Sequence, residues 1–524
     1  MKTLHFKRRW TPWVLLAALS VSASIPAVSA EDLATAQKHT GPKLTPCFAK
    51  GLSDRLLCGT IRQPLAANDA ANANTDIEIH FAVLPAINPL HRHEAVLAFA
   101  GGPGQSAFDA AATFAHALRY ARESRDILLV DQRGTGKSGL LQCDGLDLTA
   151  QFALDENSID MNALAQQDSV KCRDKLQVNL NHYTTVAAAA DFEAVRLALG
   201  YQKLHLYGGS YGTRMAQEYM RQYPAAVLTA TLDGVVPFNA SFAAMGATSE
   251  ASLEALFAYC DTTAECKTQF PQLRQQLHQL QQTLSTQTIS TKVRHPRTFE
   301  LIELQLTRAK LQQALRFALY SNSYRALVPL TISQAVQGDY HALVGLMLSQ
   351  DITESLSIGV NAAVVCAEDW PFWTEQQRRE YANNYLGKTW MDGAKAMCQV
   401  WQVAAVASDY STPLKTDTPV LLLSGGLDPV TPPSWAELAM VNMSNARHLV
   451  APHATHIVAS QSCAPKLISQ FINQQASEQL DAECLQQELR KPFLTNANGT
   501  GVSSATAQSV VPSSAPQTTS NAQE

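Results

Sequence analysis

Residues 208–212 have the sequence GGSYG and fit the pattern G-x-S-x-G. In that pattern a sharp turn from a strand into a helix exposes the serine hydroxyl, and small neighbours relieve the crowding. The surroundings agree, because a short apolar run covers residues 204–207 and a helical stretch covers residues 213–223. We therefore predict that Ser210 is a nucleophile that attacks a carbonyl carbon.

A serine nucleophile needs a base, and the base needs an acid that orients it. When the serine occupies such a turn, the acid and then the histidine follow it in the chain. Asp428 comes directly after a short apolar run, and His456 lies in a later loop. We predict these two residues as acid and base. His453 is the alternative base, and Asp233 is the alternative acid.

The tetrahedral intermediate of such a reaction requires backbone N–H donors. One predicted donor is Tyr211, the residue after the nucleophile. A second is expected from a loop with the sequence GGPG, which follows an early apolar run. Pro103 has no N–H, which leaves Gly102 or Gly104, and we favour Gly102.

Short apolar runs bounded by turn residues recur along the chain. They are typical of central strands in a parallel sheet with helices between them. The sequence therefore predicts an α/β fold with a mostly parallel central sheet. The expected strands are residues 76–85, 95–100, 127–130, 204–207, 229–232 and 420–423.

One long region interrupts this pattern. Residues 237–417 are rich in Gln and Leu and show helical periodicity, for example over residues 273–284. We interpret the region as an inserted, mainly helical cap. The two parts of the core are then residues 31–236 and 418–492. The Ser/Thr/Ala/Asn/Gln-rich end of the chain, residues 493–524, is predicted to be a disordered tail.

Residues 1–30 have the features of a secretory signal peptide. A basic start is followed by a short apolar stretch over residues 14–21 and by small residues up to Ala30. The apolar stretch is too short for a comfortable membrane anchor. We expect an exported protein, periplasmic or extracellular, with no stable membrane insertion after the signal is removed.

Cysteine usage and charge limit the other classes of function. Ten cysteines in an exported chain suggest disulfides, and their close succession favours sequential pairing; the alternative is fewer bridges and some buried thiols. No cysteine or histidine pattern indicates a zinc site, and no metal or organic cofactor is expected. The formal net charge is −5 and the mature part has no basic run, so we expect no nucleic-acid partner.

Three motifs in a fixed order connect the chain to a known family. Residues 101–104 (GGPG), 131–138 (DQRGTGKS) and 208–212 together resemble the proline iminopeptidase and tripeptidyl aminopeptidase group of α/β-hydrolases. The regions around Asp428 and His456 are similar to the C-terminal part of the group's secreted members. This resemblance implies an α/β-hydrolase fold and hydrolysis of peptide bonds near a free N-terminus.

Two positions depart from the family pattern. Ala100 stands where many relatives carry histidine, and residues 452–455 replace a Gly-rich stretch. The first change alters packing beside the GGPG loop, and the second weakens the choice of His456 over His453.

An aminopeptidase must also bind an α-ammonium group, and buried carboxylates suit that purpose. The predicted cap contains acids beside aromatic residues in the segment 366–373 (CAEDWPFW). We predict Glu368, and secondarily Asp369, as substrate-binding residues; the alternative is a surface acid near a disulfide.

Taken together, the sequence predicts an exported serine aminopeptidase that works through Ser210, His456, Asp428 and an acyl-enzyme, on peptides with a free N-terminus. Two other functions remain open. One is a carboxylesterase or lipase with the same catalytic residues, and the other is a non-catalytic binding protein with this fold.

Overall fold

The computed structural model describes residues 41–66, 75–143, 148–348, 356–496 and 498–500. The predicted signal peptide and most of the predicted tail lie outside these residues. Residues 493–496 and 498–500 of that tail are described, and two of them pack on other elements: the Phe493 ring lies 5.2 Å from the Tyr259 ring, and the Leu494 N–H donates to Ala326 O at 3.0 Å. The ordered chain therefore extends beyond residue 492.

A nine-stranded sheet forms the centre of the fold, in the order β1-β2-β3-β5-β4-β6-β7-β10-β11. The pairings from β5 to β11 are parallel, and those among β1, β2, β3 and β5 are antiparallel. The mostly parallel sheet confirms the predicted fold class. Its strands are β1 Thr45–Cys47, β2 Leu56–Pro64, β3 Asp76–Leu84, β4 Glu94–Phe99, β5 Asp126–Val130, β6 Lys203–Gly209, β7 Val227–Asp233, β10 Val420–Gly425 and β11 Ala446–Ala451.

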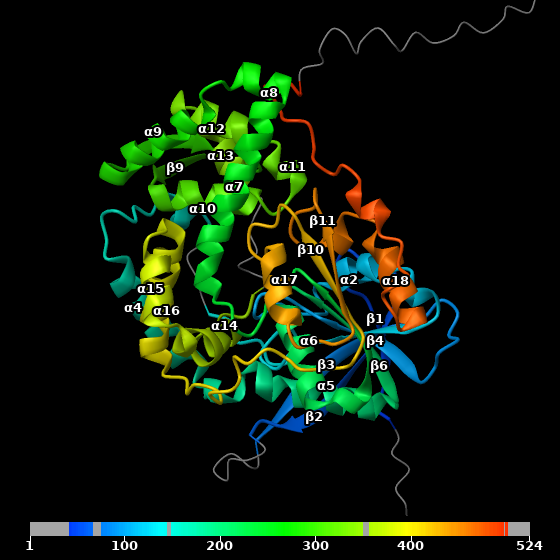
Figure 1. Cartoon of the computed structure of the whole chain (residues 1–524). Helices are drawn as coiled ribbons and strands as arrows, with labels where there is room; N and C mark the ends of the chain where they lie inside the picture. The colour runs from blue at the N-terminus through cyan, green and yellow to red at the C-terminus, as the bar shows by residue number, and fades with distance from the viewer. Residues whose placement is uncertain (1–40, 67–74, 144–147, 349–355, 497, 501–524) are drawn as a thin grey trace, which may run out of the picture. The chain divides into compact units, whose positions relative to one another are not determined.

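Helices cover both faces of the sheet (Figure 1). Phe114 and Phe471, from α2 and α18, belong to the apolar cluster on one face. Phe192, Tyr219 and Ala436, from α5, α6 and α17, belong to the cluster on the other face. These layers bury the continuous apolar strands on both sides, as parallel sheets require. The helices are α2 Ala111–Ala117, α5 Thr185–Leu199, α6 Tyr211–Gln222, α17 Pro433–Met440 and α18 Ala464–Gln474.

Between β7 and β10 the chain leaves the sheet and forms helices and one hairpin. The hairpin β8–β9 was not predicted, although its residues alternate in the way that a half-buried strand pair requires. The elements are α7 Met245–Thr262, α8 Ala264–Gln269, α9 Leu273–Thr286, β8 Ile289–Arg294, β9 Leu301–Leu306, α10 Arg308–Ala318, α11 Asn322–Arg325, α12 Val328–Val336, α13 His341–Leu348, α14 Ile358–Val364, α15 Glu375–Ala382 and α16 Tyr385–Trp401.

Two helices that precede β6 pack on these inserted elements. They are α3 (Leu148–Ala153), next to β9, and α4 (Met161–Leu176), next to α16. Phe152 lies in the apolar core of the inserted elements, and Lys310 Nζ of α10 pairs with Glu156 Oε2 at 2.6 Å. The layer over the sheet is therefore built from two separate stretches of the chain.

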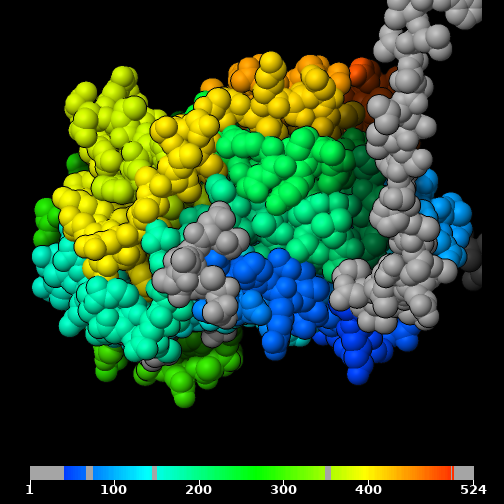
Figure 2. Space-filling view, turned by 90° about the horizontal axis from the view of Figure 1, so that it is seen from below, coloured from blue at the N-terminus to red at the C-terminus, as the bar shows by residue number. Residues whose placement is uncertain are grey.

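The segment that returns to β10 runs beside α6. Arg221 at the end of α6 donates to Tyr410 O at 3.2 Å and to Thr412 O at 2.8 Å. Figure 2 shows the yellow-to-orange surface of this part of the chain next to the green surface of the region that contains α5 and α6. These contacts fix the direction in which the chain re-enters the sheet.

Five disulfides use all ten cysteines. They join the first cysteine to the second, the third to the fourth and so on, which confirms the predicted sequential pairing. Within the described ranges, no helix has the length and apolar character that a membrane span needs. The same residues contain no cluster of His, Cys, Asp and Glu that could hold a metal ion. The disulfides are Cys47–Cys58, Cys143–Cys172, Cys260–Cys266, Cys366–Cys398 and Cys463–Cys484.

Candidate active site

Ser210 occupies the turn between β6 and α6. Its backbone has φ 56° and ψ −126°, a region that non-glycine residues rarely adopt. The turn is held from both sides, because the Ser210 N–H donates to Asp233 O at 2.9 Å and Thr213 Oγ1 donates to Ser210 O at 2.6 Å. Strained backbone of this kind is maintained by its surroundings and is common at functional sites.

Two glycines allow the helix to approach the sheet at this turn. A Cβ atom on Gly212 would lie 2.1 Å from Phe99 O, and one on Gly208 would lie 2.4 Å from Gly212 O. A side chain at Gly212 would push α6 away from the end of β4, and one at Gly208 would push the first turn of α6 away from β6. The G-x-S-x-G spacing thus has a direct steric cause in this chain.

Asp428 and His456 meet at the same edge of the sheet, in the loops that follow β10 and β11. Asp428 Oδ2 lies 2.9 Å from His456 Nδ1. Asp428 Oδ1 accepts the N–H groups of Val430 and Thr431, both at 2.9 Å, and Thr431 Oγ1 donates to Asp428 Oδ2 at 2.7 Å. These bonds hold the buried carboxylate in one orientation toward the histidine ring.

The His456 ring is oriented for proton transfer. When Nδ1–H donates to Asp428, the neutral ring leaves Nε2 as the acceptor. Burial lowers the pKa of His456, but the charge and hydrogen bond of Asp428 outweigh it and leave the pKa above its ordinary value. The ring also packs edge-on against Tyr320, with 5.3 Å between centroids. His456 and Ser210 line the same cavity.

The alternative base lies elsewhere. His453 does not line the cavity of Ser210; its Nδ1 lies 3.9 Å from Glu488 Oε1. Its backbone oxygen accepts from Asn322 Nδ2 at 2.9 Å. The structure therefore brings His456, and not His453, to Asp428.

The alternative acid has a different set of partners. The Asp233 carboxylate accepts the N–H groups of Val458 and Ala459 at 2.8 and 2.9 Å and the Tyr207 hydroxyl at 3.0 Å. Burial raises the pKa of Asp233 to about 6, against the lowering effect of these hydrogen bonds. Asp233 thus fixes the chain just after His456, while Asp428 bonds to the ring itself.

The predicted donor loop lies beside Ser210. Gly102 has φ 109°, and a Cβ atom there would lie 2.7 Å from Gly104 N, so the loop needs glycine at this position. Gln105 closes the loop, because its Oε1 accepts the Gly101 N–H at 3.1 Å. Tyr211 is the first residue of α6, directly after Ser210. The structure therefore places both predicted donor residues next to the serine.

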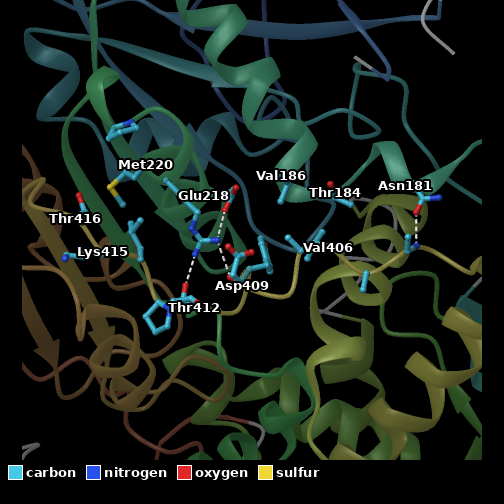
Figure 3. Close-up of a pocket in the computed structure, with 18 residues that line it drawn as sticks. Asn181, Thr184, Val186, Glu218, Met220, Val406, Asp409, Thr412, Lys415 and Thr416 are labelled. Carbon is cyan, nitrogen blue, oxygen red and sulfur yellow. Dashed lines mark hydrogen bonds and ion pairs between the residues drawn. The ribbon is translucent and has the colours of Figure 1, made fainter. Parts of the chain in front are cut away.

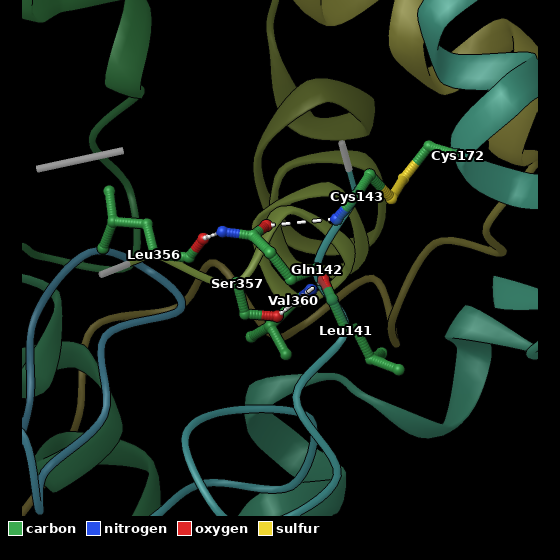
Figure 4. Close-up of a disulfide and its surroundings, with 7 residues drawn as sticks. All are labelled: Leu141, Gln142, Cys143, Cys172, Leu356, Ser357 and Val360. Carbon is green, nitrogen blue, oxygen red and sulfur yellow. Dashed lines mark hydrogen bonds between the residues drawn. A yellow bond between two sulfur atoms is a disulfide. The ribbon is translucent and has the colours of Figure 1, made fainter. Parts of the chain in front are cut away.

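Residues 356 and 357 support this loop from the inserted region. Ser357 N–H donates to Gly104 O at 2.9 Å, and Ser357 Oγ donates to Leu141 O at 3.2 Å. Gln142 Nε2 donates to Leu356 O at 3.0 Å, beside the Cys143–Cys172 disulfide (Figure 4). Residues 101–104 and Leu356 in the cavity wall are thus both connected to the residues just before the Cys143–Cys172 disulfide.

The cavity that contains Ser210 and His456 has a volume of about 440 Å³. Its walls come from the sheet edge and from the inserted helices, and most of them are apolar or aromatic. Such a site fits a substrate that is largely desolvated on binding. The apolar and aromatic lining residues are Phe99, Pro103, Ala110, Phe114, Tyr207, Phe242, Met245, Phe317, Tyr320, Leu356, Trp390, Val430 and Ile457.

The two acids predicted to bind substrate do not line this cavity. Glu368 is 1% exposed and accepts Thr185 N–H at 2.5 Å, with Thr185 Oγ1 and the Tyr410 hydroxyl both at 2.6 Å. Asp369 is 3% exposed and accepts the Trp373 Nε1–H at 3.0 Å. The structure does not bring either carboxylate to Ser210, because both are engaged inside the protein.

Burial also changes the titration of these acids. It raises the pKa of Glu368, and it raises the pKa of Asp369 to about 7, in spite of the nearby Arg214 guanidinium. Asp369 additionally accepts the Phe242 N–H at 3.2 Å. Since Phe242 lines the Ser210 cavity, this acid supports the wall from behind.

A second, larger cavity of about 790 Å³ lies apart from Ser210 (Figure 3). Two of its charged groups bind one another: Arg221 pairs with Glu218 at 3.2 Å, and Arg221 also donates to backbone oxygens of the return segment. Its size exceeds that of the Ser210 cavity, but it lacks a nucleophile paired with a base among its lining residues. We therefore assign the candidate chemistry to the smaller cavity.

Sequence reasoning missed three residues of the site. Thr431 bonds to Asp428, Tyr320 packs on His456, and Arg316 from α10 lines the cavity. The motif DPVT contains Thr431, so its position three residues after the acid was a usable signal. Nothing in the helical periodicity of α10 distinguishes Arg316 from a solvated arginine.

Comparison with known families agrees with this geometry. The family model for the alpha/beta hydrolase fold matches residues 94–461, which include Ser210, Asp428 and His456. The chain belongs to the α/β-hydrolase fold family. The match begins at β4 and ends just after β11, so it spans the parallel part of the sheet and the inserted region.

Named relatives of this α/β-hydrolase include peptidases. It is 35% identical over 150 residues to the serine protease Hip1 of Mycobacterium tuberculosis, covering 27% of this chain and 29% of Hip1. It is 31% identical over 155 residues to the tripeptidyl aminopeptidase of Streptomyces coelicolor, covering 28% of this chain and 29% of that protein. The matched part thus spans less than a third of either relative.

Among solved structures, proline iminopeptidase of Mycobacterium smegmatis aligns with 80% of this chain and 98% of its own chain, at a TM-score of 0.36 and 16% identity.

Proposed function

We propose that this α/β-hydrolase is an exported serine aminopeptidase that cleaves peptide bonds near a free N-terminus. One observation carries the proposal: Ser210, in a strained turn, shares a cavity with a His456–Asp428 pair joined at 2.9 Å. A serine, a histidine and an acid with these relations form the general arrangement of serine hydrolases.

The proposed reaction uses each group at a stated atom. His456 Nε2 takes the proton from Ser210 Oγ as that oxygen attacks the substrate carbonyl carbon, and Asp428 stabilises the resulting imidazolium. The N–H groups of Gly102 and Tyr211 donate to the oxyanion. His456 then returns the proton to the leaving amine, and water hydrolyses the acyl-enzyme by the reverse sequence of transfers.

The choice of peptides over other acyl substrates is supported by the relatives. Two of them are named as a serine protease and a tripeptidyl aminopeptidase. Export is supported by the five disulfides, because such bonds persist in oxidising compartments. Mass measurement of the mature protein recovered from its producing cells tests whether residues 1–30 are removed.

A fluorophosphonate probe tests the nucleophile directly. Wild-type protein is expected to be labelled at Ser210, and the Ser210→Ala variant is expected to remain unlabelled. Ser462, which donates to Val458 O at 2.8 Å outside the cavity, offers a matched control: Ser462→Ala is expected to keep the label. Unlabelled wild-type protein would support the non-catalytic alternative.

Substrate pairs test the aminopeptidase step. Tripeptide anilides with a free amine are expected to be cleaved faster than the same anilides with an acetylated amine. Equal rates would show that the enzyme does not require a free N-terminus.

A carboxylesterase is the second candidate, because the cavity walls are largely apolar. It predicts rapid hydrolysis of short acyl esters with no cleavage of the matched amides. Measuring both on the same preparation separates the two functions.

A further inference from the structure

The charge in the Ser210 cavity is uneven. Among the described residues that line it, Arg316 contributes a guanidinium, and none contributes a carboxylate. His456 is the other lining residue that can carry a positive charge, and it lies close enough for Arg316 to lower its pKa in opposition to Asp428. Among these lining residues, Arg316 therefore carries the permanent positive charge.

Arg316 is held in place without being neutralised. It lies near the end of α10, half-buried, with its Nη2 3.3 Å from the Tyr320 hydroxyl and 4.0 Å from Met245 Sδ. Its guanidinium also lies 5.2 Å from the Phe317 ring centroid. Among the described residues, no carboxylate forms an ion pair with it, and its other N–H donors have no protein partner.

An unpaired cation in an apolar cavity is unfavourable until an anion arrives. A guanidinium has five N–H donors in a planar fork, and the two contacts of Arg316 engage one end of it. The free donors match the two oxygens of a carboxylate, and such charge-assisted pairs are strong and directional. The aromatic neighbours Phe317 and Tyr320 limit the directions that the side chain can take.

The position of Arg316 relates it to the reacting bond. Tyr320 contacts both groups: its hydroxyl bonds to Arg316, and its ring packs edge-on against His456. A single aromatic ring thus separates the guanidinium from the proposed base. An anion bound by Arg316 would belong to a residue close to the scissile bond.

We propose that Arg316 binds a carboxylate of the substrate, so that the enzyme prefers short peptides carrying an anionic group near the scissile bond. The carboxylate is either an acidic side chain or the free C-terminus of the leaving fragment. This inference rests on the proposed peptidase function and adds the substrate class to it.

Matched substrates distinguish the two sources of the carboxylate. One series has tripeptide coumarin amides with Glu or Gln at each position in turn, and the other has short peptides that end in a free carboxylate or in an amide. We expect about a tenfold higher kcat/KM for the anionic member of at least one pair. Ratios below about two in every pair would overturn the proposal.

Three variants assign the preference to one side chain. The ratio is expected to fall to about one in Arg316→Gln and to persist in part in Arg316→Lys, which keeps the charge but loses the fork. Arg62→Gln removes the same charge from an exposed residue outside the cavity and is expected to keep the wild-type ratio. Each enzyme is its own reference, so partial loss of folded protein does not change a ratio. A tenfold preference that persisted in Arg316→Gln would contradict the assignment.

A labelling experiment tests the carboxylate site even if the protein cleaves no peptide. If no peptide is cleaved, the rate of fluorophosphonate labelling is measured with N-acetylglutamate present or with its diamide, N-acetylglutamine amide, which carries no carboxylate. Protection by the glutamate derivative in wild type, and its loss in Arg316→Gln, would support the carboxylate site. Equal protection by both compounds, or none, would overturn it.

Discussion

Two acidic regions of this protein differ in what their carboxylates contact. Asp428 follows β10 and bonds to the His456 ring at the cavity of Ser210. Glu368 and Asp369 follow α14, and neither lines that cavity. Glu368 bonds to Thr185 at the start of α5, and Asp369 bonds to Trp373 in the inserted region. The first carboxylate is the one that we propose for catalysis, and the other two bind groups in the interior of the protein.

The difference shows which sequence signals carry spatial information. The ends of neighbouring parallel strands meet at one edge of the sheet, so a residue just after a strand has a defined place. Acids among aromatic residues in a helical insertion have no such constraint, since the orientation of the helix decides whether they face a cavity or a core.

The largest contrast is expected from Asp428→Asn. Loss of the carboxylate leaves His456 in the wrong tautomer, which lowers kcat by about 10⁴-fold. Steady-state hydrolysis measures this effect. Asp168→Asn, an exposed acid on α4, is the matched control and is expected to keep the wild-type rate. A loss below about tenfold in Asp428→Asn would remove Asp428 from the proposed catalytic set.

Glu368→Ala is expected to affect stability. It leaves Thr185 N–H, Thr185 Oγ1 and the Tyr410 hydroxyl without a partner, which lowers the free energy of unfolding by about 3 kcal/mol. Denaturant unfolding measures it, with the exposed Glu375→Ala as control. The KM ratio between free-amine and acetylated substrates is expected to stay constant; a selective rise for free amines would restore Glu368 as a substrate ligand.

The dependence of activity on pH sharpens the contrast further. His456 must be neutral to accept a proton, and Asp428 holds the pKa of His456 above its usual 6.5. We therefore expect kcat/KM to rise with pH through a midpoint above 6.5. In Asp428→Asn the residual activity is expected to have a lower midpoint, because the stabilising negative charge is gone. An unchanged midpoint would show that another group controls the titration.

The smallest effect is expected from Thr431→Val. The change keeps the shape of the side chain and removes the hydroxyl that donates to Asp428 Oδ2 at 2.7 Å. Loss of one hydrogen bond to a charged group is expected to lower kcat/KM about fivefold. Thr416→Val, in the other cavity, provides the control. An effect as large as that of Asp428→Asn would indicate displacement of the acid.

Most of the sheet, Ser210 and Asp428 could be predicted because apolar runs bounded by turn residues report strand ends, whereas His456 was predicted from its place after Asp428 in the chain. β11 escaped prediction, since Arg447 and His448 interrupt its apolar character. Arg316 could not be predicted either, because only the packing of α10 with α9 and α13 places one arginine of this helix in the wall of the Ser210 cavity. The packing of the inserted elements determines both the position of Arg316 in the cavity wall and the burial of Glu368.

The five disulfides have a consequence for biosynthesis. Each joins a cysteine to the next one in the chain, across separations of 6 to 32 residues, and none crosses from one pair to another. A chain that emerges from its N-terminus presents every correct partner before the following pair arrives. An oxidase that links cysteines in order of appearance would therefore produce the native set, and isomerase activity would be needed only to repair errors.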